Sequence, residues 1–137
     1  MQEVFDKYDD NVFRAANSLG AGLAYKGETC GSLLGGYLML GLKFGLGREE
    51  IDSPEKLHTS YPASQEFYDW FHHELGSANC RDIRATLEKG LDFDQLDPQQ
   101  REKAIFDELH RRCDQITGKV AARIVEILWD AIEAEKE

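Results

Sequence analysis

The sequence predicts an all-α protein: a bundle of four long helices and one short helix. Apolar residues recur at three- and four-residue steps along most of the chain, and we find no alternating apolar–polar stretch of the kind that forms a strand. Glycines and Ser-Pro or Asp-Pro pairs separate the periodic segments, as they do at helix ends and helix starts. One segment, residues 31–44, is apolar on almost every side. Such a helix is typical of the centre of a bundle.

The first helix is expected over residues 3–19, where apolar residues form one face and Gly20 marks the end. A turn of small residues, 20–27, leads from it to the central helix at 31–44. The central helix carries four glycines, Gly31, Gly35, Gly36 and Gly41. Each costs about 1 kcal/mol of helix propensity relative to alanine. We therefore expect that they serve the close approach of a neighbouring backbone or bulky group.

The remaining helices follow from proline and glycine positions. A helix is expected from Ser53-Pro54, and Pro62 either kinks or restarts it before it stops at Gly76. A short helix is expected over residues 80–89. Asp97-Pro98 should begin the longest helix, because its apolar period continues almost to the end of the chain.

Length and charge limit the function classes. A chain of 137 residues is the size of one domain, so residues 1–137 are expected to fold as a single unit. The formal net charge is −10, from 16 Lys+Arg and 26 Asp+Glu. Such a surface repels phosphate backbones and anionic headgroups, so no nucleic-acid or membrane partner is expected. The sequence shows no signal-peptide pattern and no apolar run long enough to span a bilayer, which predicts a cytoplasmic protein.

The three cysteines, Cys30, Cys80 and Cys113, are the residues that carry chemistry. Their odd number and wide spacing favour redox or metal chemistry over a disulfide framework. Cys30 and Cys80 fall at predicted helix N-termini, where the helix dipole should stabilise a thiolate. The alternative is that the cysteines are small apolar core residues.

A fourth donor is available on the last helix. His110 lies three residues before Cys113, so both side chains share one face. Cys30, Cys80, Cys113 and His110 could together hold zinc, and three thiolates with another ligand could hold an iron–sulfur cluster. There is no CxxC or CxxH spacing to support this, and a hydrogen-bonded structural histidine is the alternative.

A family resemblance joins these features. Residues 29–45, TCGSLLGGYLMLGLKFG, resemble the core motif of the proteins named for the cysteine pattern C_GCAxxG_C_C, which are described as redox-active. The match continues through residues 76–83, GSANCRDI, to Cys113. Ser32 stands where the family tends to have alanine, and no cysteine precedes Cys30, so the family's first cysteine is absent.

The resemblance implies redox or metal chemistry carried by Cys30, Cys80 and Cys113. On this reading Gly31 and Gly35 leave room beside Cys30 for zinc, an iron–sulfur cluster or an incoming disulfide. A redox partner protein and a homodimer are expected partners. The alternative function is a helical dimerisation or interaction module whose cysteines are structural.

Overall fold

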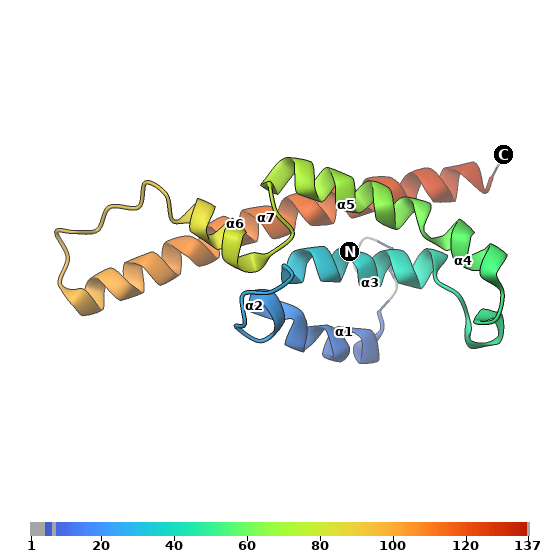
Figure 1. Cartoon of the computed structure of the whole chain (residues 1–137), viewed down its shortest axis with the longest axis horizontal. Coiled ribbons are helices and arrows are strands. Elements are labelled where there is room, and N and C mark those ends of the chain that lie inside the picture. The colour runs from blue at the N-terminus through green and yellow to red at the C-terminus, as the bar shows by residue number, and fades with distance from the viewer. Residues whose placement is uncertain (1–4, 7, 137) are drawn as a thin grey trace.

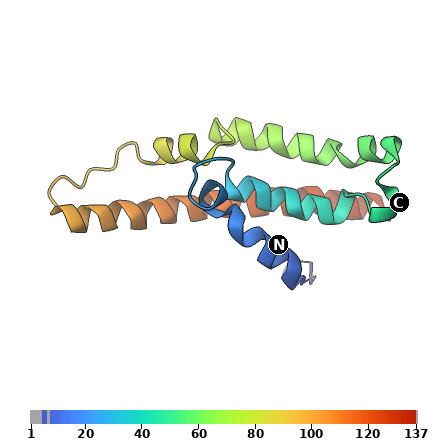
Figure 2. The same ribbon diagram turned by 60° about the horizontal axis from the view of Figure 1, so that its bottom comes forward.

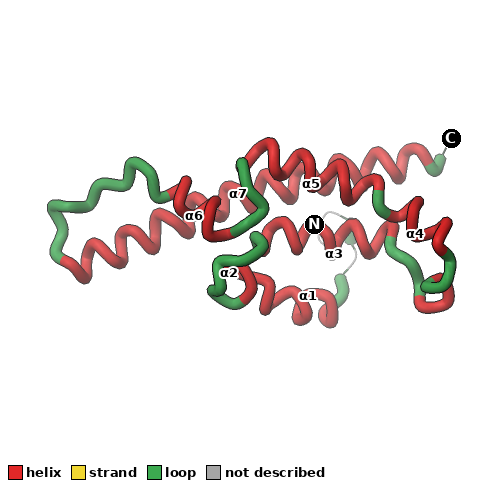
Figure 3. Tube along the Cα trace, in the orientation of Figure 1, coloured by secondary structure: helices red, strands yellow, loops and turns green. Residues whose placement is uncertain are grey.

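The computed structural model describes residues 5–6 and 8–136, and within these residues every regular element is a helix (Figure 1, Figure 3). The predicted all-α class is therefore confirmed. None of the described helices is long and apolar enough to cross a membrane.

Seven α-helices and two 3-10 turns follow one another along the described chain. They are α1 (Asp10–Ala16), η1 (Asn17–Leu19), α2 (Gly20–Leu23), α3 (Gly31–Phe44), η2 (Arg48–Glu50), α4 (Pro54–Ser60), α5 (Pro62–Leu75), α6 (Cys80–Leu87) and α7 (Pro98–Ala134). The longest, α7, runs the full length of the molecule, and α3 and α5 pack along its C-terminal half (Figure 1, Figure 2). Its N-terminal half extends beyond them and carries α6 at its inner end.

The core lies where α3, α5 and α7 meet. Fully buried side chains come from all three helices, among them Leu40, Phe67 and Ile124. Burying one such side chain stabilises the fold by about 1.5–3 kcal/mol. The helices approach closely at Gly36, because a Cβ atom there would lie 2.5 Å from the ring of Phe67. The predicted role of the glycines in close packing therefore holds at Gly36.

Proline and aspartate set the helix starts as predicted. The central helix α3 has the predicted bounds, and prolines open α4, α5 and α7. At the start of α7 the Asp97 carboxylate accepts hydrogen bonds from the backbone N–H groups of Gln99 and Gln100, at 3.1 and 3.0 Å. These bonds satisfy two of the donors that a helix N-terminus leaves open.

The first helix is shorter than predicted. Residues 3, 4 and 7 of the predicted segment lie outside the described residues, and Phe5 and Asp6 form a turn. The helix begins at Asp10 because the Asp9 carboxylate accepts hydrogen bonds from Asn11 and Val12 and caps it there. No residue of α1 is buried, and Figure 2 shows the helix diverging from α3. The apolar period was therefore a poor guide to a core-packed helix in this segment.

The turn of small residues expected after the first helix is present, and it is left-handed; it includes α2, which is therefore not a regular right-handed helix. Ala21, Gly22, Leu23, Ala24 and Tyr25 all have positive φ, between 51° and 68°. For residues other than glycine this conformation costs about 1–2 kcal/mol each, because Cβ crowds the following carbonyl. The turn folds the chain back against the start of α3 and α6.

Candidate functional site

A short backbone pairing holds Cys30 and Cys80 next to each other. Thr29 and Asn79 form an antiparallel bridge. On one side of it the N–H of Cys30 donates to the carbonyl of Ala78, at 2.8 Å, and on the other the N–H of Cys80 donates to Glu28, at 2.7 Å. Each cysteine directly follows a bridged residue, so both side chains lie on the same face of the pairing.

The two cysteines also occupy the predicted helix N-termini. Cys30 is the N-cap of α3 and Cys80 is the first residue of α6. Behind Cys80 lies Gly22, in the left-handed turn. A Cβ atom at Gly22 would come within 2.6 Å of the Cys80 Cβ and 2.8 Å of the Glu28 backbone nitrogen. Only glycine fits there, so the turn is packed directly against the site.

The cysteines line a cavity of about 520 Å³ between α3, α6, α7 and the left-handed turn. Cys30, Cys80, Cys113 and His110 all lie on its wall, and the structure thus brings the four predicted donors to one place. All three cysteines are free thiols. Cys30 and Cys80 are half-buried, whereas Cys113 is exposed.

The two glycines predicted to leave room beside Cys30 differ. Both line the cavity. A Cβ at Gly31 would lie 2.7 Å from the carbonyl oxygen of Leu19, so the space beside Gly31 is filled by the backbone of residues 19–20. A Cβ at Gly35 would meet no atom within 4 Å. The expected open space therefore exists at Gly35, and Gly31 serves instead for close packing.

A hydrogen bond fixes one nitrogen of the His110 ring. Nδ1 lies 2.9 Å from the carbonyl oxygen of Phe106, and the His110 and Phe106 rings are in contact, with centroids 3.9 Å apart and planes tilted by 44°. A carbonyl oxygen only accepts, so Nδ1 carries the proton in this bond. In the neutral ring Nε2 is then the nitrogen with a free lone pair, as it is in histidines that bind metals or accept protons.

Hydroxyl groups tie α3 to α7 beside the cavity. Thr117 donates to the carbonyl oxygen of Cys113 at 3.1 Å, and the Ser32 and Thr117 hydroxyls lie 2.8 Å apart. Since Thr117 has a single hydroxyl proton, Ser32 donates to Thr117 in this arrangement. The Ser32 hydroxyl thus links α3 to the helix that carries Cys113.

The thiols influence one another electrostatically. Burial raises the pKa of the Cys80 thiol, and a negative charge on Cys30 raises it further, while the positive charge of Arg84 lowers it. Although Cys113 as a residue is exposed, it lines the cavity and its thiol loses part of its contact with water, which raises its pKa; charge on Cys80 and Cys30 raises the pKa further. The predicted stabilisation of a Cys80 thiolate is therefore wrong, because loss of water outweighs the helix N-terminus.

Arg84 is the site residue that sequence reasoning missed. It lines the cavity, and its charge lowers the pKa of both Cys80 and Cys113. The signal was its spacing: Arg84 lies four residues after Cys80, so the two share a face of α6.

The four donors are not arranged as a metal centre. Among the described residues, no group of three or more His, Cys, Asp or Glu side chains has a geometry that could hold a metal ion. The donor set matches the chemistry of zinc or iron–sulfur ligation, but binding would require the side chains to turn toward a common point.

Comparison with known proteins places these cysteines in a family. The family model described as "Putative redox-active protein (C_GCAxxG_C_C)" matches residues 1–127. The chain belongs to this family. No curated protein and no solved structure matches the chain. The C_GCAxxG_C_C pattern contains four cysteines, whereas this member has three, and the three line one cavity.

Proposed function

We propose that Cys30, Cys80 and Cys113 form one redox-active thiol site that exchanges electrons with a disulfide. The observation that carries the proposal is that three cysteines distant in sequence line a single cavity. Two of them are also held beside each other by backbone hydrogen bonds. Membership of the C_GCAxxG_C_C family supports redox chemistry as the general class.

Cys30 is the attacking thiolate in this proposal. It occupies the N-cap position of α3, a helix of 14 residues, and the N–H groups and dipole of a helix N-terminus favour an anion. Its sulfur attacks a disulfide of the substrate, forms a mixed disulfide and releases one substrate thiolate. That thiolate takes the proton of the Cys80 thiol, which leaves Cys80 as the thiolate for the second exchange.

The second exchange closes the reaction. The Cys80 sulfur attacks the Cys30 sulfur, a Cys30–Cys80 disulfide forms, and the second substrate sulfur leaves as a thiolate that takes up the proton Cys30 gave to solvent. Two protein thiols are oxidised and one substrate disulfide is reduced to two thiols. The reverse exchange, with a redox partner protein that supplies a dithiol, restores the site.

A metal centre is the second candidate. Because Nδ1 of His110 is hydrogen-bonded to the Phe106 carbonyl, Nε2 keeps a lone pair that could bind a metal. The three thiols supply the sulfur donors that zinc and iron–sulfur clusters prefer. Bound zinc would hold the three helices together, and a cluster would carry electrons.

One experiment separates these candidates. The protein is purified without oxygen, its zinc, iron and sulfide are measured, and its thiols are counted before and after oxidation by glutathione disulfide. We expect little metal, and a fall from three thiols to one with Cys30 and Cys80 joined in the peptide map. Cys113→Ser is the matched control and should still form the disulfide, whereas Cys30→Ser and Cys80→Ser should not.

Two other results would point elsewhere. Stoichiometric metal that is lost in His110→Ala and in each cysteine variant would support the metal centre. A triple Cys→Ser variant that folds and dimerises like the parent, while the parent's thiols oxidise independently, would support the dimerisation module with structural cysteines.

A further inference from the structure

The cavity beside the cysteines has the size and walls of a small-molecule site. Its volume of about 520 Å³ falls within the range of about 300–1,000 Å³ that is usual for ligand sites. Its wall is mainly apolar, and α6 and α7 contribute apolar side chains that include Ile83, Leu109 and Val120. The thiols stand on this wall, so a molecule in the cavity would meet them directly.

Gly35 keeps the cavity open. One residue further along α3, Gly36 is needed for packing because a Cβ there would strike the Phe67 ring. Gly35 has no such neighbour and faces open space on the cavity side. A glycine inside a helix makes the helix less stable than an alanine would. At Gly35 no neighbouring atom requires the absence of a side chain, so glycine does not serve helix packing there; its effect is to leave space in the cavity.

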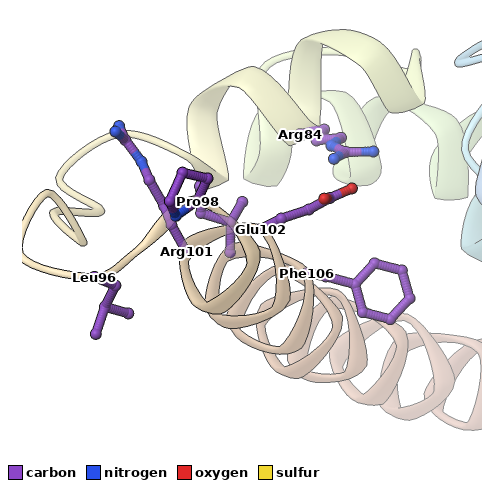
Figure 4. Close-up of a pocket in the computed structure, with 7 residues that line it drawn as sticks. Arg84, Leu96, Pro98, Arg101, Glu102 and Phe106 are labelled. Carbon is purple, nitrogen blue, oxygen red and sulfur yellow. The ribbon is translucent and has the colours of Figure 1, made fainter.

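The charged groups of the wall favour a neutral ligand. Arg81 and Arg84 already have acidic partners, Glu28 at 3.3 Å and Glu88 at 2.9 Å. Among the described residues that line the cavity there is no Asp or Glu. Figure 4 shows the adjoining pocket, where the side chain of Arg84 points toward Glu102. With its cations paired outside, the wall presents mainly apolar surface and sulfur.

We propose that the cavity binds a neutral, apolar organic disulfide and presents its sulfur–sulfur bond to Cys30. The inference rests on the proposed function and adds the substrate class. The apolar body packs against Ile83, Leu109 and Val120, and the exchange is the one written above, with the organic disulfide reduced to two thiols. A hydrophilic disulfide has little apolar surface to bury in the cavity, so it reacts with the thiols by simple collision, without binding first.

Binding is tested with a probe that cannot react. 1,2-Di(2-pyridyl)ethane has the two rings of 2,2′-dithiodipyridine joined by CH₂–CH₂ in place of the disulfide. Calorimetry should show one saturable site per chain. Gly35→Leu should weaken binding of the probe at least about tenfold, because the leucine side chain takes up space that the probe would fill. Loss of the burial of only two CH₂ groups of the probe already accounts for that factor. Gly41→Leu is the matched control, on the same helix, also with no atom within 4 Å of its Cβ, and outside the cavity.

Substrate preference is tested with the reactive pair. Rates of thiol oxidation by 2,2′-dithiodipyridine and by 2-hydroxyethyl disulfide are each divided by the rate of the same reagent with N-acetylcysteine. The apolar reagent should show an excess of at least about tenfold in the parent and in Gly41→Leu, and the excess should vanish in Gly35→Leu. Gly35→Ala should fall between the parent and Gly35→Leu.

The outcomes distinguish this inference from the proposed function. No saturable binding, or equal binding in Gly35→Leu and the parent, overturns the inference while leaving a glutathione-driven Cys30–Cys80 disulfide untouched. Binding of the unreactive probe in a protein whose thiols never pair supports the cavity as an apolar site and overturns its role in disulfide exchange. Binding that weakens as the protein dimerises shows a second copy in the cavity and also overturns the inference.

Discussion

Gly22→Ala should destabilise the protein strongly and disturb Cys80. A Cβ at Gly22 would lie 2.6 Å from the Cys80 Cβ and within 2.9 Å of the Glu28 backbone, at a φ of +67°. The left-handed backbone costs about 1–2 kcal/mol for alanine, and forcing atoms into a packed region costs about 1–3 kcal/mol more. Against this stands a gain of about 0.4–1 kcal/mol, because alanine restricts the unfolded chain. The net loss should be about 3 kcal/mol.

Two other glycines separate these contributions. Gly76 has a φ of +73° with no atom within 4 Å of its Cβ, so Gly76→Ala should show the backbone cost alone, about 1 kcal/mol. Gly20 has a φ of −59° and no close atom, so Gly20→Ala should be neutral or stabilising by up to about 1 kcal/mol.

Urea unfolding of the three variants measures these differences. Alkylation of each cysteine in the folded protein, followed by peptide mapping, then reports on the site. In Gly22→Ala the Cys80 thiol should react faster than in the parent, because the turn that packs against it must shift. If Gly22→Ala loses no more stability than Gly76→Ala, the turn does not press on Cys80 and the reasoning is refuted.

Three further predictions concern the fold and its pH dependence. Burial raises the pKa of Cys80 and Cys113 above the ordinary value of 9.0, so the folded state favours the protonated thiols. The free energy of unfolding should therefore fall as pH rises through 9 and beyond. In urea titrations at alkaline pH, the double variant Cys80→Ser, Cys113→Ser should show a smaller fall than the parent. Asp97→Ala should remove about 0.5–2 kcal/mol by uncapping α7, measured by chemical unfolding, and Asp97→Asn should retain most of it. Gly36→Ala should lose up to about 2 kcal/mol, because crowding of the Phe67 ring costs about 1–3 kcal/mol and alanine regains about 1 kcal/mol of helix propensity; a higher melting midpoint than the parent's would contradict the close packing.

Local rules predicted the helices whose ends are set by side chains in the same segment. The start of α7 follows from Asp97 and Pro98, because an aspartate cap and a proline act within a few residues of themselves. The central helix α3 was likewise predicted with its observed bounds, since a helix that is apolar on all sides needs no knowledge of its neighbours.

Features set by distant parts of the chain could not be predicted. Gly31 and Gly35 look alike in sequence, but the backbone of residue 19 packs against one and not the other. The left-handed conformation of Leu23 and Ala24 contradicts their local preference and is imposed by the surrounding contacts. The pKa of Cys80 is raised for the same kind of reason, because burial, to which the left-handed turn packed against Cys80 contributes, removes water from a helix N-terminus that would otherwise favour its thiolate.

Because Cys30 and Cys80 are adjacent, oxidation of the two thiols to a disulfide would restrict the unfolded chain and so change the stability of the fold. A disulfide between them would close a loop of about 50 residues that contains all of α3, α4 and α5, and the chain-entropy model assigns such a loop about 4 kcal/mol of stabilisation. The oxidised protein would then resist heat and proteolysis more than the reduced protein. Because the reduced protein would be degraded faster than the oxidised protein, the amount of protein in a cell would depend on the redox state of its thiols.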